Sequence, residues 1–203
     1  FDGPFHLECG RQLPAVTVAY ETYGTLNPAG DNAVLICHAI SGDSHVAQHD
    51  QQDDPGWWDI AVGPGKPIDT ARYFVICPNI LGGCRGTTGP ISVNPATGRA
   101  YGPDFPLITI GDIVKLQKQL IDYLGIDRLL AVVGGSLGGH MALTWATQYP
   151  DAVAGCAAVA TSPRLMRVHA AIRVHAAPFT GDRSMSADIE RLAAAIVAGE
   201  LRA

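Results

Sequence analysis

The stretch LLAVVGGSLGGHMALTWA, residues 129–146, decides the fold that the sequence predicts. It begins with an uninterrupted apolar run from Leu129 to Val133, which is typical of a strand buried in a parallel sheet. The turn after it carries the pattern Gly-x-Ser-x-Gly around Ser136, and helix-like sequence then continues to Pro150. We therefore predict a strand, a sharp turn and a helix, with Ser136 on the turn.

The residue types in this turn point to nucleophilic chemistry. A turn this tight strains its central residue, and Gly134 and Gly138 lack the Cβ atoms that would collide as the helix folds back. Ser136 then lies beside a helix N-terminus, which favours a developing negative charge. We predict Ser136 as the nucleophile and the N–H of Leu137 as one oxyanion donor. The alternative is a glycine-rich turn with an idle serine.

A second apolar strand, residues 32–37, ends in the loop HAISG, residues 38–42. A serine nucleophile of this kind needs a second N–H donor from the loop after an earlier strand. We assign that role to the N–H of Ile40, against the alternative of an ordinary strand-end loop. His38 is predicted as a structural histidine rather than a base.

The rest of the chain alternates between strand and helix patterns. A helical stripe begins at a capping-box variant, Thr109 to Asp112, and ends at Gly125. Further apolar or β-branched runs predict strands at 14–23, 73–77 and 153–160. This alternation predicts an α/β fold, a mostly parallel sheet with helices on both faces.

Composition excludes several classes of protein. The chain has 203 residues, 47% of them hydrophobic and 16% charged, which favours one packed domain over disorder. A formal net charge of −5 argues against a nucleic-acid partner. No apolar run is long enough to span a membrane, and the N-terminus lacks the pattern of a signal peptide. We therefore expect no membrane partner and a cytoplasmic location.

The cysteines and the loops give weaker indications. The 5 cysteines form no Cys-x-x-Cys pair, so we expect a reduced setting and no metal site. The glycine-rich loop 79–90 lacks the ending of a phosphate-binding loop, and its Arg85 is predicted to be a surface arginine. Trp57 and Trp58 either floor a ligand pocket or pin their loop onto the body.

Several long motifs together resemble one family. The chain is similar to the α/β-hydrolase superfamily and, within it, to the homoserine O-acetyltransferases, over about residues 1–165. The matching motifs are HAISGDSH (38–45), PGWWD (55–59), GPGKPIDT (63–70), LGGCRGTTGP (81–90), NPATG (94–98), DFP (104–106) and GGSLGG (134–139).

This resemblance implies an acyltransferase of methionine biosynthesis with a ping-pong mechanism. Ser136 would take an acetyl group from acetyl-CoA and pass it to the hydroxyl of L-homoserine, with the N–H groups of Ile40 and Leu137 holding the oxyanion. Acetyl-CoA would be a co-substrate, with no bound cofactor and no assigned residues for binding one. Relatives that use succinyl-CoA leave the acyl donor open, and the resemblance also implies a homodimer as one arrangement.

The chain departs from the family pattern after residue 165. A serine nucleophile needs a later Asp and His, but His169, His175, Asp182 and Asp188 follow Ser136 too closely, so we assign neither an acid nor a base. We expect residues 1–165 to be the N-terminal part of a hydrolase domain, truncated before the last strands. We expect residues 166–203 to be a divergent tail, as the start of a lid region or a non-native C-terminus.

Two alternative functions stay open. One is a catalytically incomplete fragment or pseudo-enzyme, and the other is a serine esterase of the same fold. The loops at 55–70 and 81–98 favour the acyltransferase over the esterase.

Overall fold

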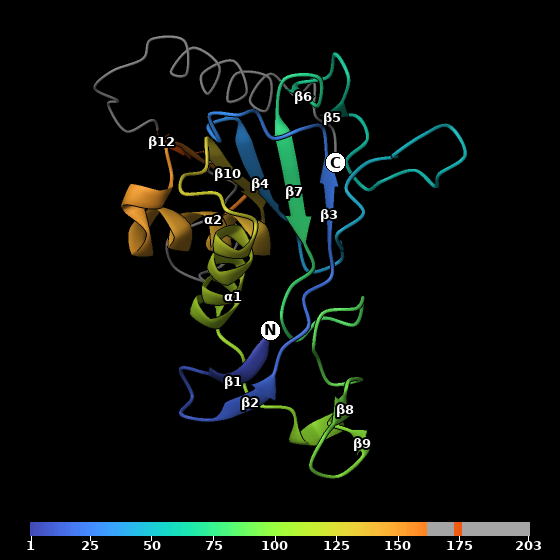
Figure 1. Ribbon diagram of the computed structural model, residues 1–203, viewed down its shortest axis with the longest axis vertical. Helices are drawn as coiled ribbons and strands as arrows, with labels where there is room; N and C mark the ends of the chain where they lie inside the picture. The colour runs from blue at the N-terminus through green and yellow to red at the C-terminus, as the bar shows by residue number, and fades with distance from the viewer. Residues whose placement is uncertain (162–172, 176–203) are drawn as a thin grey trace.

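In the computed structural model, the described residues are 1–161, together with the backbone of 173–175. Their centre is a 6-stranded sheet with the order β12-β11-β10-β4-β7-β3 (Figure 1). Strands β11, β10, β4 and β7 are parallel, and β12 and β3 pair antiparallel at the two edges. The strands are β3 (Tyr20–Tyr23), β4 (Ala33–Cys37), β7 (Phe74–Pro78), β10 (Ala131–Gly135), β11 (Cys156–Val159) and β12 (Arg173–His175). The predicted α/β fold with a mostly parallel sheet is confirmed.

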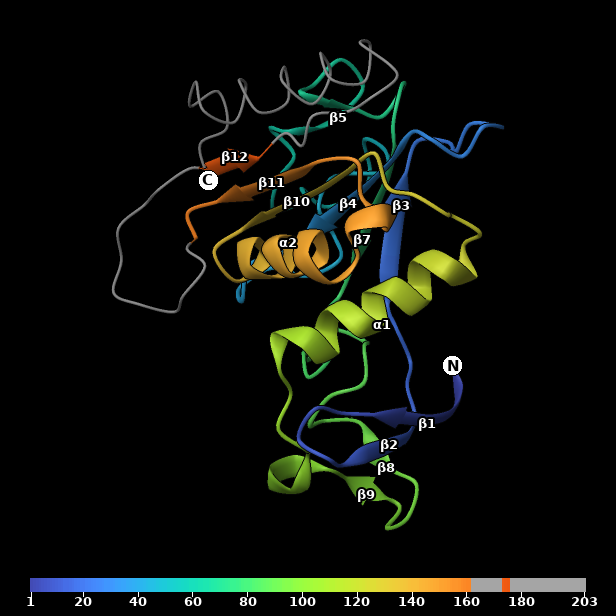
Figure 2. The ribbon, with the colours of Figure 1, turned by 90° about the vertical axis from the view of Figure 1, so that its left-hand side faces the viewer.

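Both α-helices in the described part of the chain cover the same face of this sheet. Helix α2 (Leu137–Gln148) packs on the strands, and α1 (Ile110–Tyr123) packs on α2 (Figure 2). The buried Trp145 of α2 donates a hydrogen bond of 2.8 Å to Gln117 of α1. The capping box predicted at Thr109 and Asp112 is present at the start of α1.

A loop segment covers the opposite face. Its apolar side chains are buried in one cluster with those side chains of β4, β7 and β10 that point away from the helices. The loop residues of this cluster include Val46, Ala47, Ala61, Val62 and Ile68. This segment contains the short strands β5 (Val62–Gly63) and β6 (Ile68–Asp69). Within residues 1–161 no α-helix lies on this face. In this part of the chain the predicted helices on both faces are therefore present on one face, where α1 and α2 pack.

The single strand predicted at 14–23 is wrong. The structure has β2 (Gln12–Ala15), paired with β1 (Asp2–His6), and then β3 after a gap. The intervening residues bond to a loop and not to a strand, since the N–H groups of Thr17 and Ala19 donate to the hydroxyls of Thr88 and Thr87. The hydrogen-bond partner changes along the segment, which strand propensity does not reveal.

The remaining elements are short. The hairpins β1–β2 and β8–β9 lie beyond α1, at the bottom of Figure 1. The second hairpin consists of β8 (Val93–Asn94) and β9 (Arg99–Ala100), and the 3-10 turn η1 (Gly102–Asp104) follows it. The other 3-10 turn, η2 (Pro150–Ala152), follows α2 and contacts it. The antiparallel β12 was not predicted, and the rest of the tail 166–203 lies outside the described residues. Among the helices of the described residues, none combines the length and the apolar character that a membrane-spanning helix needs.

Candidate active site

Ser136 stands at the turn between β10 and α2, as predicted. Its backbone has φ 54° and ψ −115°, and a positive φ of this kind is rare for a residue with a side chain. Such a conformation costs roughly 1–3 kcal/mol and persists only when the surroundings enforce it. Here the Ser136 N–H donates to the Val159 carbonyl at 3.0 Å, which ties the turn to β11.

The glycines beside Ser136 are required by close backbone contacts. A Cβ atom on Gly134 would overlap the Gly138 carbonyl, and a Cβ atom on Gly138 would overlap the Cys37 carbonyl. The predicted steric reason for both glycines is therefore confirmed. The second overlap also shows that the start of α2 lies against the end of β4, where the loop 38–42 begins.

The two predicted oxyanion donors lie in this region. Leu137 is the first residue of α2, so its N–H has no intrahelical acceptor. Ile40 is the second residue of a turn closed by a hydrogen bond of 2.9 Å from the Gly42 N–H to the Ala39 carbonyl, and within residues 1–161 its own N–H donates to no other group. The side chain of Ile40 is 79% exposed, so packing of that side chain does not explain its position. The donor roles of both N–H groups stay predictions.

His38 is a structural histidine, as predicted. It is 1% exposed, its Nδ1–H donates to the Ala39 carbonyl at 2.7 Å, and its Nε2 accepts from the Ile80 N–H at 3.2 Å. Burial lowers its pKa, because a charged imidazole is poorly solvated there. With both ring nitrogens engaged, His38 joins the loop after β4 to the loop after β7.

No described histidine forms a hydrogen bond with the Ser136 hydroxyl. His140 contacts Ser136 only through the backbone, where its N–H donates to the Ser136 carbonyl at 3.2 Å. The side chains of His169, His175, Asp182 and Asp188 lie outside the described residues.

A pocket of about 450 Å³ lies beside the loop that carries Ile40. Arg85 lines it and pairs with Asp43, with 3.3 Å between Nη1 and Oδ2. Trp57 also lines it, stacks on Trp58 and donates from Nε1 to the Asp43 carbonyl. Trp57 thus anchors its loop, which is one of the two predicted roles, and its place in the lining of a ligand pocket stays a prediction. The full lining of this pocket is Ser41, Gly42, Asp43, His45, Asp53, Asp54, Pro55, Trp57 and Arg85.

A second hollow, of about 470 Å³, lies at the opposite ends of the strands, so it is remote from Ser136.

The structure also brings together residues that the sequence analysis did not select. Glu21, His45 and His49 meet beside this pocket, and the one sequence signal for them is the spacing His-x-x-x-His. The hydrogen bond to the Asp54 carbonyl, aided by the Glu21 carboxylate and opposed by burial, raises the pKa of His45 to about 9. Burial alone would raise the pKa of Glu21, but hydrogen bonds from Tyr23 and His45 hold it below its usual value.

Comparisons with known proteins extend these observations. A homoserine O-acetyltransferase of Symbiobacterium thermophilum is 62% identical over 156 residues, which is 76% of this chain and 41% of that protein. A homoserine O-succinyltransferase of Halothiobacillus neapolitanus is 58% identical over 167 residues, 81% of this chain and 41% of that protein. The chain thus spans about two fifths of the length of these relatives.

Solved structures show the same fold. A homoserine O-acetyltransferase from Bacillus anthracis superposes with a TM-score of 0.69 and 47% identity, covering 74% of this chain and 42% of the other. The esterase E22 gives a TM-score of 0.71 and 45% identity, covering 75% of this chain and 44% of the other. Residues 32–201 match the alpha/beta hydrolase fold family, which agrees with the parallel sheet and the strained serine turn. By its sequence and its fold, this chain belongs to the alpha/beta hydrolase fold family.

Proposed function

We propose that this chain carries the nucleophile half of a homoserine O-acyltransferase of methionine biosynthesis. The observation that carries the proposal is the strained Ser136 turn, set in a sequence that is about 60% identical to homoserine O-acetyl- and O-succinyltransferases. The fold alone hosts many reactions, so the argument rests on this turn and on the loops around it.

The proposed reaction has two half-reactions. Ser136 Oγ attacks the thioester carbonyl of acetyl-CoA, the N–H groups of Ile40 and Leu137 stabilise the oxyanion, and the CoA thiolate leaves. The hydroxyl of L-homoserine then attacks the acetyl-serine ester through a second tetrahedral intermediate, which yields O-acetylhomoserine and frees Ser136. The described residues offer no base in contact with Ser136, so the proposal assigns none.

Acetyl-CoA is the proposed donor, as a co-substrate without a bound cofactor. Relatives named for acetyl and for succinyl transfer match at similar identity, so succinyl-CoA is the competing donor. We also propose residues 1–165 as the N-terminal part of the hydrolase domain, a cytoplasmic location in keeping with five free cysteines, and a homodimer. Size-exclusion chromatography with light scattering tests the homodimer.

Ester hydrolysis is the second candidate. It is supported by the likeness to esterase E22, at 45% identity. The two reactions share the acyl-enzyme and differ in whether water or an alcohol resolves it.

Intact-protein mass spectrometry separates these functions. The chain is mixed with acetyl-CoA, or with succinyl-CoA in parallel, and L-homoserine is added afterwards. Transferase activity predicts an acyl adduct on Ser136 that homoserine discharges much faster than buffer does, and esterase activity predicts equal rates. The Ser136→Ala variant should form no adduct. A folded chain that forms none would contradict both functions for these residues and favour a catalytically incomplete fragment.

A further inference from the structure

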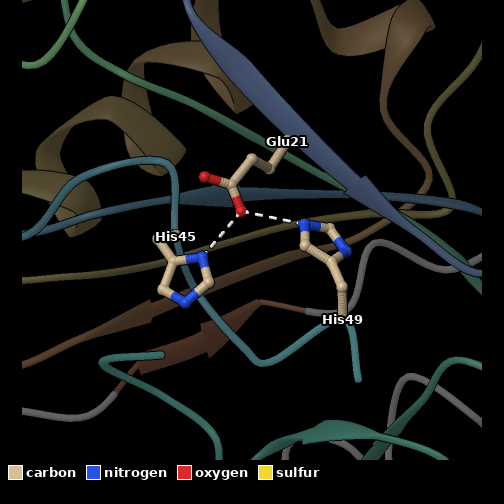
Figure 3. Close-up of side chains that lie close together, drawn as sticks. All are labelled: Glu21, His45 and His49. Carbon is tan, nitrogen blue, oxygen red and sulfur yellow. Dashed lines mark hydrogen bonds and ion pairs between the residues drawn. The ribbon is translucent and has the colours of Figure 1, made fainter. Parts of the chain in front are cut away.

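Three side chains with metal-binding atoms converge beside the pocket. Glu21 comes from β3, and His45 and His49 come from the loop that follows β4 (Figure 3). Oε2 of Glu21 lies 2.9 Å from Nδ1 of His45 and 3.1 Å from Nε2 of His49. All three ligand atoms lie within 4.8 Å of one another, so a single ion can reach them.

Neighbouring groups orient these ligands. The Nε2–H of His45 donates to the Asp54 carbonyl at 2.8 Å, which directs Nδ1 toward Glu21. The Tyr23 hydroxyl donates to Oε2 of Glu21 at 2.7 Å, and the Tyr23 ring stacks on the His49 ring at 4.5 Å. Metal-binding histidines typically donate their other N–H to a carbonyl or carboxylate in this way, and the carboxylate ligand is itself hydrogen-bonded.

The charges around the cluster favour a cation. The loop segment 43–59 contains several aspartates and no lysine or arginine. Asp53 Oδ2 lies 3.9 Å from Nε2 of His45, and Arg85, which approaches the same loop, is paired with Asp43. A divalent ion at the cluster would therefore enter a negative field.

We propose that Glu21, His45 and His49 form a binding site for a divalent transition-metal ion, with Zn²⁺ the best match. Two imidazoles and a carboxylate suit zinc, whereas Mg²⁺ and Ca²⁺ prefer oxygen ligands alone. Tetrahedral zinc places neighbouring ligand atoms roughly 3.4 Å apart, close to the two distances observed from Glu21. His49 is partly exposed and can rotate to complete the geometry, and water supplies the fourth ligand.

The ion takes the place of the protons that otherwise bridge Glu21 to the two imidazoles. It joins β3 to the loop that forms the pocket wall, so it braces the segment next to Ile40. The site shares no residue with the Ser136 turn, and it is independent of the acyl-transfer proposal. The cysteine spacings gave no indication of it, because its ligands are histidines and a distant glutamate.

Cobalt substitution provides the direct test. The chain, with the exposed Cys9 and Cys84 replaced by serine, is freed of metal with a chelator and titrated with Co²⁺. The expected result is one equivalent bound with the intense visible absorption of tetrahedral cobalt, and displacement of that cobalt by Zn²⁺. His49→Ala should abolish the signal, and His6→Ala, which changes an exposed histidine of β1, should leave it unchanged.

Two isosteric variants guard against a folding artefact. Glu21→Gln should abolish tetrahedral cobalt binding, and Tyr23→Phe, which removes only the hydroxyl, should weaken Zn²⁺ binding about 10- to 100-fold. Circular dichroism checks that each variant is folded. Excess Zn²⁺ should raise the Tm of the parent protein and of His6→Ala, and it should leave the Tm of His49→Ala and of Glu21→Gln unchanged. If His49→Ala and Glu21→Gln bound Co²⁺ as tightly as the parent protein does, the proposal would be overturned. The proposal would also be overturned if the folded parent protein showed no absorption of tetrahedral cobalt on titration with Co²⁺.

Discussion

The turn at Ser136 and the loop segment 38–59 lie at the same edge of the sheet but are held in different ways. The turn is fixed by backbone atoms in direct contact, because Gly134 and Gly138 leave no room for a side chain. The loop is held by side-chain hydrogen bonds, such as those of His45 to Glu21 and to the Asp54 carbonyl.

This difference separates two kinds of sensitivity. Steric contacts do not depend on pH or on ions, so substitutions at the turn should act through packing alone. Hydrogen bonds to imidazoles and carboxylates change with protonation and metal binding. The geometry of the nucleophile should therefore persist under conditions that alter the pocket wall.

The largest expected effect is at Gly138. Gly138→Val places a branched side chain against the Cys37 carbonyl, which forces α2 away from β4. We expect the free energy of unfolding in urea to fall by more than about 4 kcal/mol, or the protein not to fold. The matched control is Gly135→Ala, whose added Cβ meets nothing closer than the Val159 carbonyl at 4.0 Å. Equal losses for the two variants would contradict the steric account.

The next effect concerns the support beneath the turn. Trp145→Phe removes the hydrogen bond to Gln117 and leaves the buried amide oxygen short of a strong donor. We expect a loss of about 1–3 kcal/mol in the free energy of unfolding. The double variant Trp145→Phe, Gln117→Met should recover part of that loss, because both polar partners are then absent. A double variant less stable than either single variant would argue against this reason.

On the loop side, His38 predicts a dependence on pH. Its folded pKa lies below the unfolded value of 6.5, so its contribution to stability is full above that pH and is lost as the pH falls through the folded pKa. Protonation of Nε2 breaks the bond from the Ile80 N–H.

Urea unfolding at pH 7 and pH 5 measures this effect. We expect the parent to lose up to about 1.4 kcal/mol per pH unit over part of this range beyond what His38→Gln loses. Parallel pH profiles for the two proteins would show that His38 does not carry the dependence.

The smallest expected effect is a gain at Ser136. Ser136→Gly removes the side chain from a backbone with φ 54°, and we expect about 1 kcal/mol of added stability from the relieved strain. Ser136→Ala keeps a Cβ and should show no such gain. Urea unfolding of the parent, Ser136→Gly and Ser136→Ala measures the gain. If Ser136→Ala were stabilised as much as Ser136→Gly, the strain would lie in the hydroxyl group and not in the backbone.

The sequence by itself determined the parts of this protein that depend on neighbours along the chain. The apolar run before Ser136, Gly134 and the capping box of Thr109 each specify their own backbone, because the atoms in conflict or in contact are a few residues apart. Gly138 also fits the local turn motif, but the carbonyl that a side chain there would meet belongs to Cys37 of the distant strand β4. The parallel sheet follows from the repetition of such units.

Only the tertiary structure decided which distant residues meet. Glu21 reaches His45 and His49 across separations of 24 and 28 residues, and no local pattern encodes that meeting. The break in the strand predicted at 14–23 has the same cause, since Thr17 bonds to a loop 71 residues away. Side-chain chemistry and spacing identify candidate groups, but their distances depend on how the strands pair and how the loops pack over them.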